Sequence, residues 1–256
     1  MLHANRCKEK ENMFPAIKRP SRCGLGALLF FVLLGAWPLA TRGAEPENDF
    51  FRICSKGTLE DVRKALIIGV NIHARDGQGM TALMYAARDN ADPEVMKVLL
   101  RAAAPRRPWY KLGGEVAVED RDKEGRTALM FAVENNSPDV VGVLLDAGAD
   151  VNARDKRDMT VLMRAVTHKS GSKVVEMLLD AGADVNVAGT SGVTALMLAA
   201  SKNSDLDVVR ALLKSGADAC AKDVIGHDAL WYAQVSRRER GQKEQLLRML
   251  RESASR

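Results

Sequence analysis

The stretch LLDAGADVN occurs twice without change, at Leu144–Asn152 and at Leu178–Asn186, 34 residues apart. Weaker copies lie upstream, as IGVNIHARD at Ile68–Asp76, and one period later, as SGADACAKD at Ser215–Asp223. A catalytic site has no need of the same phrase twice, whereas stacked structural units repeat at a fixed period of about 20–50 residues. The repetition therefore predicts a solenoid in which each unit buries its apolar face against the next.

A second phrase keeps step with the first. It reads TALMYAA, TALMFAV, TVLMRAV, TALMLAA and DALWYAQ, and its copies start at Thr81, Thr127, Thr160, Thr194 and Asp228. The starts are separated by 46, 33, 34 and 34 residues. The first interval is thus 13 residues longer than a standard unit, which predicts an insertion at about 103–115.

Each unit is expected to hold two short helices and a loop. In the third unit, Leu129, Ala132 and Val133 recur at helical spacing. Ser137–Asp139 then begins the second helix, with Ser as N-cap, Pro at the first helical position and Asp at the positive end of the helix dipole. Gly148 supplies the positive φ that ends this helix.

The units resemble ankyrin repeats, whose pattern is G-x-T-P-L-H-x-A-A, then V-x-x-L-L, then G-A-D-V-N-A-x-D. The resemblance covers about residues 49–256 and implies an all-α solenoid of about four full repeats between N- and C-terminal capping units. The family's His is replaced by Met84, Met130, Met163 and Met197. We expect this methionine stripe to fill the core rather than to bind a soft metal. Leu144 and Leu178 are expected in the core as well.

The expected organisation follows the two phrases. It consists of a signal peptide at 1–43, an N-terminal capping unit at 44–78, a repeat with the insertion at 79–124, repeats at 125–157, 158–191 and 192–225, and a C-terminal capping unit at 226–256. In the caps, Phe50 and Phe51 stand where other units have Leu and Met, and Leu246, Leu247 and Leu250 face inward below a charged outer surface.

The leader has the pattern of an export signal. Leu25–Trp37 is an apolar run that follows three basic residues, and Thr41 and Gly43 precede a plausible cleavage point before Ala44. Met13 is an alternative start that shortens an unusually long basic segment. The other interpretation is an uncleaved anchor, but the 16 residues of Leu25–Ala40 fall short of the roughly 18–20 that span a bilayer.

Charge is concentrated in the leader. The first 43 residues hold seven of the 38 basic residues and two of the 33 acidic ones, so the remainder holds 31 of each and has no net charge. A nucleic-acid partner is therefore not expected for the body of the protein. After removal of the leader only Cys54 and Cys220 remain, in the first and fifth units. They are too far apart for a disulfide, which needs Cα atoms within about 7 Å, and we expect two buried, inert thiols.

No catalytic arrangement stands out in the mature sequence. His73, His168 and His227 lie in different units, and no His-x-x-x-His or Cys-x-x-Cys spacing is present for zinc. No nucleophile elbow or phosphate loop occurs either. The sequence therefore predicts no enzyme activity, no catalytic residue, no metal and no cofactor.

The resemblance implies a binding face built from the exposed sides of the first helices and the loop tips, on the concave side of the array. The helix positions are Tyr85, Arg88, Phe131, Glu134, Arg164, His168, Leu198, Lys202 and Tyr232. The tip positions are Met80, Lys156, Arg157 and Met159. These residues differ between units while the framework repeats, which is expected of a binding face but equally of unconstrained surface. Tyr, Phe, Met and Arg are favoured interface anchors, and this favours binding.

The insertion is the remaining candidate. It contains Arg106 and Arg107 beside Trp109 and Tyr110. We expect either that Trp109 folds back over exposed helix ends or that the segment is an arm that contacts the partner, with membrane contact as a third alternative. Its three basic residues on a neutral body make nucleic acid a poor target.

These observations predict a monomeric, non-catalytic protein-interaction module. Its resemblance to exported bacterial ankyrin repeat proteins implies the cell envelope, most simply the periplasm. The alternatives are a secreted effector that acts on a host protein, an anchored form that keeps its N-terminal segment, and an accessory domain that binds a small ligand or assists an enzyme.

Overall fold

The computed structural model describes residues 46–103, 118–135, 138–168, 171–202 and 205–255 of the chain. Within these ranges it contains twelve α-helices and no β-strand, and they belong to one compact unit, Ala44–Arg256. The expected signal peptide lies outside the described residues, and so does the insertion apart from its first residue, Ala103. The all-α solenoid predicted from the repeats is confirmed.

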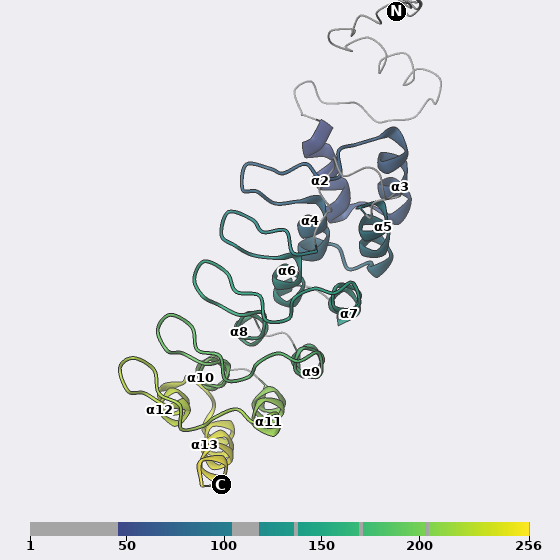
Figure 1. The fold of residues 1–256 in the computed structure, drawn as a ribbon. Helices are drawn as coiled ribbons and strands as arrows, with labels where there is room; N and C mark the ends of the chain where they lie inside the picture. Colours follow the sequence, from purple (N-terminus) through teal and green to yellow (C-terminus); the bar gives the residue numbers. More distant parts are fainter. Residues whose placement is uncertain (1–45, 104–117, 136–137, 169–170, 203–204, 256) are drawn as a thin grey trace, which may run out of the picture. The chain divides into compact units, whose positions relative to one another are not determined.

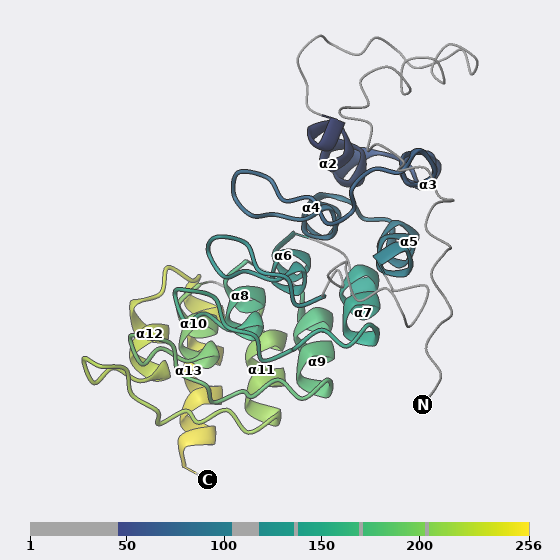
Figure 2. The ribbon, with the colours of Figure 1, turned by 45° about the horizontal axis from the view of Figure 1, so that its top comes forward.

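The helices form two layers (Figures 1 and 2). The inner layer, next to the hairpins, contains α2 (Pro46–Lys56), α4 (Ala82–Asp89), α6 (Ala128–Asn135), α8 (Val161–Thr167), α10 (Ala195–Ser201) and α12 (Ala229–Val235). The outer layer contains α3 (Leu59–Ile68), α5 (Pro93–Ala103), α7 (Pro138–Asp146), α9 (Ser172–Asp180), α11 (Leu206–Lys214) and α13 (Arg240–Ala254). Each helix packs against its own partner and against the neighbouring helices of its layer, as stacked repeats do.

The repeated threonine starts the inner helices. The side chains of Thr81, Thr160 and Thr194 each accept a hydrogen bond from the backbone N–H three residues later, so that one free donor of each helix is satisfied. The outer helix α7 begins at Pro138, as predicted, and α5 begins in the same way at Pro93, because the fixed φ of proline suits the first turn and its missing N–H is not needed there. The predicted N-cap of α7, Ser137, lies outside the described residues.

The core lies between the two layers. Leu144 and Leu178, the first residues of the two identical phrases, are completely buried. The methionine stripe, from Met84 through Met130 and Met163 to Met197, is at most 1% exposed. Its predicted role as core filling is confirmed.

The capping units close the ends of the core. Phe50 and Phe51 of α2 are buried, and so are Leu246 and Leu250 of α13, as predicted. Leu247 is only partly buried, because it lies one position off the stripe that faces α11 and α12. None of the described helices has the length and apolar character needed to cross a membrane.

Hairpins connect each outer helix to the next inner helix and extend from the same side of the inner layer (Figure 1). We call their ends the tips before α4 (76–80), α6 (122–126), α8 (155–159), α10 (189–193) and α12 (223–227). Gly148 ends α7 with a φ of 84°, the left-handed conformation that the sequence predicted for it. The backbone N–H groups of Lys123, Lys156 and Val224 each donate to a carbonyl of the preceding tip, at 2.8, 2.9 and 3.1 Å, and the Thr190 hydroxyl donates to the Arg157 carbonyl at 3.5 Å. The tips are thus joined in a ladder.

Candidate functional site

An aspartate closes four of the five tips. In the tip before α8, Oδ1 of Asp155 accepts hydrogen bonds from the backbone N–H groups of Arg157 and Met159, each at 2.8 Å. Asp76, Asp122 and Asp223 make the same pair of bonds in their own tips. The side chain thus fixes the turn from within, which is a common role of aspartate in loops.

The second carboxylate oxygen ties the tip to its inner helix. Oδ2 of Asp76 accepts from the hydroxyl of Tyr85 at 2.7 Å, and Oδ2 of Asp223 accepts from the hydroxyl of Tyr232 at 2.8 Å. Arg164 donates to Asp155 from the same position of α8. Three of the residues proposed to bind a partner therefore hold the hairpins in place, a role that their spacing of nine residues from an aspartate could have suggested.

Two units depart from this pattern, each in a consistent way. In the tip before α6, Nε of Arg126 donates to Asp122 at 2.8 Å, and the guanidinium lies 4.5 Å from the ring centre of Phe131. In the unit that contains α10, Leu198 occupies the position of Tyr85 and Arg164 but has no donor group. Gly189 replaces the aspartate of the tip in this unit. The tip aspartate and its donor on the inner helix are thus both absent from this unit, as expected if the main role of each is to bond the other.

Phe131 and Met80 are corrections to the predicted binding face. Phe131 is 2% exposed because Arg126 covers its ring, and Met80 is 3% exposed. Nη1 of Arg88 lies 3.7 Å from the Met80 sulfur. Neither Phe131 nor Met80 is available as a surface anchor in this structure.

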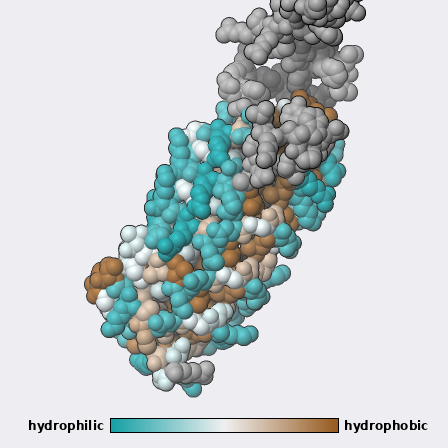
Figure 3. All heavy atoms as spheres, in the orientation of Figure 1, coloured by the Kyte–Doolittle hydropathy of each residue, from teal (hydrophilic) through white to brown (hydrophobic). Residues whose placement is uncertain are grey.

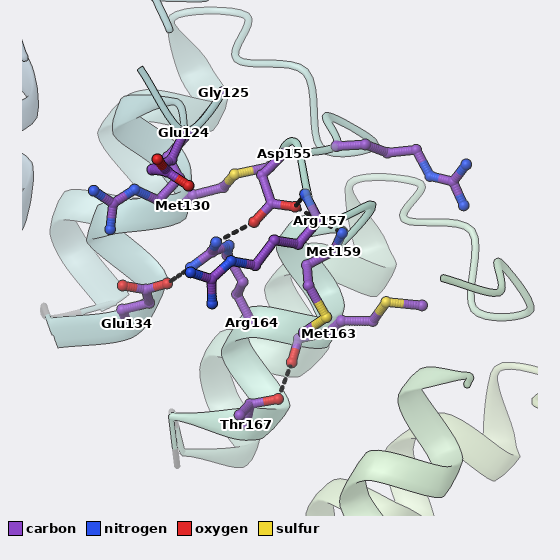
Figure 4. Close-up of polar contacts among 12 residues, drawn as sticks. Glu124, Gly125, Met130, Glu134, Asp155, Arg157, Met159, Met163, Arg164 and Thr167 are labelled. Carbon is purple, nitrogen blue, oxygen red and sulfur yellow. Dashed lines mark hydrogen bonds and ion pairs between the residues drawn. The ribbon is translucent and has the colours of Figure 1, made fainter. Parts of the chain in front are cut away.

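Arg164 forms the most buried ionic cluster of the hairpin side (Figure 4). Its guanidinium donates to Asp155 in its own tip and to Glu134 on α6. The side chains of Arg164, Glu134 and Asp155 are 12%, 8% and 1% exposed. His168 lies at the edge of this cluster, with Nε2 3.7 Å from Glu134 Oε1.

The cluster shifts the pKa of Asp155 and of Arg164. Burial alone would raise the pKa of Asp155, but hydrogen bonds from Arg164 and from the Met159 and Arg157 backbone outweigh it and leave the pKa lowered. Burial likewise opposes the charge of Arg164, yet its two carboxylate partners keep its pKa raised. Both shifts favour the charged forms of Asp155 and Arg164.

On α4, the first inner helix of the predicted binding face, the side chains also pair with one another. Arg88 contacts Asp89 at 2.8 Å and lies 4.8 Å from the ring centre of Tyr85, which stacks on Phe51. By contrast, Lys156, Arg157 and Lys202 are exposed. Among the described residues none of these three side chains forms an ion pair. Met159 is half-buried.

An apolar surface that the sequence did not predict lies at the tip before α12. Val224 and Ile225 are 73% and 75% exposed, and Trp231 on α12 is 39% exposed. The Trp231 ring stacks on His227 with 3.6 Å between ring centres. Figure 3 shows this tip as a hydrophobic projection at the left edge of the array. Two apolar residues in a loop carry no periodic signal from which their exposure could be predicted.

The remaining predicted site residues lie outside the described residues. They are the four of the insertion, Arg106, Arg107, Trp109 and Tyr110. Within the described part of the chain no group of His, Cys, Asp or Glu has the arrangement of a metal site.

The two cysteines differ from each other. Cys54 is buried, as predicted, and burial raises the pKa of its thiol to about 12. Cys220 is exposed, so the prediction of two buried thiols is wrong for this residue. It occupies the repeat position of Asn152 and Asn186, which in their units bond the following hairpin. The hairpin that contains Cys220 is the last one, so no following hairpin covers this residue.

Three segments of the chain, 50–155, 110–189 and 162–253, match the family model described as ankyrin repeats in three copies. A chain from the complex of the Bd0816 predatory endopeptidase of Bdellovibrio bacteriovorus with immunity protein Bd3460 is 29% identical, with a TM-score of 0.63, and the match covers 79% of this chain and 96% of that one. The ankyrin repeat domain of Bcl-3, a member of the IkappaB protein family, is 27% identical, with a TM-score of 0.64 and 82% and 86% covered. No curated protein matches the sequence.

Proposed function

Because the chain belongs to the ankyrin repeat family, we propose that it is a non-catalytic module that binds a partner protein through its hairpin tips and the exposed sides of its inner helices. The observation that supports this most directly is a contrast in pairing. Arg164, Tyr85 and Tyr232 are held by internal bonds, whereas Lys156 and Arg157 at a tip are exposed and lack an ion-pair partner among the described residues. The inner helices thus fix the tips, and the tips present free side chains.

The similar structures support a protein partner. One comes from a complex of an endopeptidase with an immunity protein, and ankyrin repeats are protein-interaction modules. A pull-down with the full chain, read by mass spectrometry, tests the proposal. We expect one protein to be enriched in amounts comparable to the bait. Enrichment of a nucleic acid, or of no protein above background, would contradict it.

We further propose that the protein is exported to the bacterial cell envelope and acts in the periplasm. The support is the leader alone: an apolar run of signal-peptide length behind basic residues, followed by small residues before Ala44. Cell fractionation with N-terminal sequencing provides the test. We expect a mature chain that begins near Ala44 in the periplasmic fraction. A processed chain in the culture medium would favour a secreted effector, and an unprocessed chain in the membrane fraction would favour an anchor.

The insertion at 103–115 is proposed as an additional arm that contacts the partner. Its composition supports this, because Trp109 and Tyr110 are typical interface anchors and two arginines precede them. Deleting the 13 residues restores the standard period, so the variant is expected to fold with similar stability and to capture less partner. If the variant unfolds, the segment is structural, and if capture is unchanged, the arm does not contribute to binding.

A further inference from the structure

We propose that the tips before α8, α10 and α12 form one docking surface for an extended partner segment that places acidic side chains on Lys156 and Arg157 and an apolar side chain on Val224 and Ile225. This inference rests on the proposed protein-binding function and specifies the chemistry of the partner. It is based on the second and third residues of each tip, which change from basic through small and polar to apolar along the array.

The basic end of the surface is the tip before α8. Its two acidic residues are already neutralised, since Asp155 is bonded to Arg164 and Asp158 contacts Arg154 at 3.0 Å. Lys156 and Arg157 are left exposed without a counter-charge in their own tip. The exposed acidic residue of the preceding tip, Glu124, directly follows the exposed Lys123 in the sequence. The net charge offered to a partner here is positive, and an acidic segment is its complement.

The middle of the surface is small and uncharged. The tip before α10 has Thr190 and Ser191 at the positions of Lys156 and Arg157, with a glycine on either side. A segment that crosses this tip therefore meets neither a large side chain nor an opposing charge. The Thr190 hydroxyl donates to the Arg157 carbonyl at 3.5 Å, and its oxygen and the Ser191 hydroxyl can hydrogen-bond to the backbone of the segment.

The apolar end is the tip before α12, where Val224 and Ile225 occupy the same two positions. Exposed apolar side chains mark interaction sites when they gather, as Val224 and Ile225 do in this tip. The charged helix α13 packs against α11 and α12 at the end of the array. It leaves Val224 and Ile225 largely uncovered.

The ladder between the tips also ends here. Backbone links join neighbouring tips, as in the bond from the Val224 N–H to the Ser191 carbonyl at 3.1 Å. Between the tips before α8 and α10 the Thr190 hydroxyl makes the link, donating to the Arg157 carbonyl at 3.5 Å. The equivalent carbonyl of the last tip belongs to Ile225, and no hairpin follows it. A partner backbone that runs along the tips can continue the ladder by donating an N–H to this carbonyl. The docking surface is thus continuous with the interface that already joins the units.

Site-specific photo-crosslinking in cells of the source organism tests the proposal. A benzophenone amino acid replaces Thr190 in the middle of the surface and, as a control, Glu176 on the exposed side of α9. We expect position 190 to cross-link a segment of another protein that contains acidic residues on one side of the linkage and an apolar residue on the other. Position 176 is expected to give no such product.

Paired variants then separate the two ends of the surface. In the position-190 background, K156E/R157E and V224S/I225S are each expected to lower the cross-linked product about tenfold, while E176K leaves it unchanged. Raising NaCl from about 0.05 to about 0.5 M in the corresponding purified pair should weaken binding of the unchanged protein but not of K156E/R157E. All changed residues are exposed, so circular dichroism should show unaltered folding.

Several outcomes would overturn the inference. They are a product that links position 190 only to this chain itself, a basic partner segment, or variants that leave the yield unchanged. If a probe on an inner helix, at Lys202, captures a partner while position 190 does not, the protein-binding function stands and the proposed docking surface is wrong. If no position captures a partner, both fail.

Discussion

The guanidinium of Arg164 on α8 bonds to the carboxylate of Asp155, nine residues earlier in the tip of its own hairpin. The same guanidinium reaches Glu134 on the preceding inner helix. One side chain thus fixes the angle of a hairpin and joins two consecutive units. Because all three side chains are at least 88% buried, the cluster matters for stability rather than for capture of a partner.

Replacing Arg164 with leucine should be strongly destabilising. The change leaves Glu134 and Asp155 buried without their cation, and removing one partner of a buried ion pair costs about 3–5 kcal/mol. Urea denaturation followed by circular dichroism measures the loss. The double variant R164L/E134L is the control, since it also removes a stranded carboxylate and should be more stable than R164L alone. A single variant within about 0.5 kcal/mol of the natural protein would mean that the cluster contributes little.

Acid should remove part of this stability. The pKa of Asp155 is lowered in the folded protein, so its carboxylate stabilises the fold at any pH above its unfolded pKa of about 3.9, and the contribution disappears as the pH falls from there through the folded pKa. The D155N variant keeps an oxygen for the two backbone N–H groups but lacks the titrating charge. We expect D155N to be less stable than the natural protein at pH 7 and to lose less stability between about pH 5 and pH 2. Parallel pH profiles for the two proteins would refute this assignment.

The sequence was sufficient for the parts of the fold that depend on local chemistry. Threonine caps, prolines at the first helical position and the buried methionine stripe follow from residue type and spacing alone. The site was less predictable, because exposure depends on neighbours that the sequence does not place. Phe131 was expected on the surface and is buried because Arg126 lies over it. The exposure of Val224 and Ile225 in the hydrophobic tip could not be predicted, because solvent exposure in a loop produces no periodic sequence pattern.

Two glycines provide a test of the ladder between tips. Gly125 has a φ of 79°, and a Cβ there would lie 3.0 Å from the backbone nitrogen of Lys156 in the next tip. G125A should therefore cost about 1–3 kcal/mol, from the left-handed backbone and from the displaced neighbour. Gly142 lies inside α7, where a Cβ meets only the flexible end of Met177 at 3.4 Å. G142A should stabilise the protein by about 0.5–1 kcal/mol in thermal unfolding, because alanine favours the helix. Equal effects of the two changes would show that the tips tolerate displacement.

The opening phrase of the sequence ends in an asparagine whose repetition has a structural purpose. Oδ1 of Asn152 accepts from the backbone N–H of Asp184 at 2.9 Å, and its Nδ2 donates to the Gly182 carbonyl at 3.1 Å. Both partners belong to the next unit, so N152A removes two bonds across one junction and should cost about 1–2 kcal/mol. Cys220 is the matched control, since it holds the same position in the fifth unit and no further hairpin follows the one that contains it. C220A should change the free energy of unfolding by less than about 0.5 kcal/mol.

Hydrogen exchange resolves where the loss occurs. In a solenoid, stability is the sum of the units and of the contacts between neighbours, so a weakened junction lowers protection mainly in the units that it joins. For N152A we expect faster exchange in α7 and α9, on either side of the junction, and little change in α3 at the far end of the array. Uniformly faster exchange from α3 to α13 would indicate that the array unfolds as one cooperative block, and the repeated asparagine would then stabilise the whole rather than the single junction that it spans.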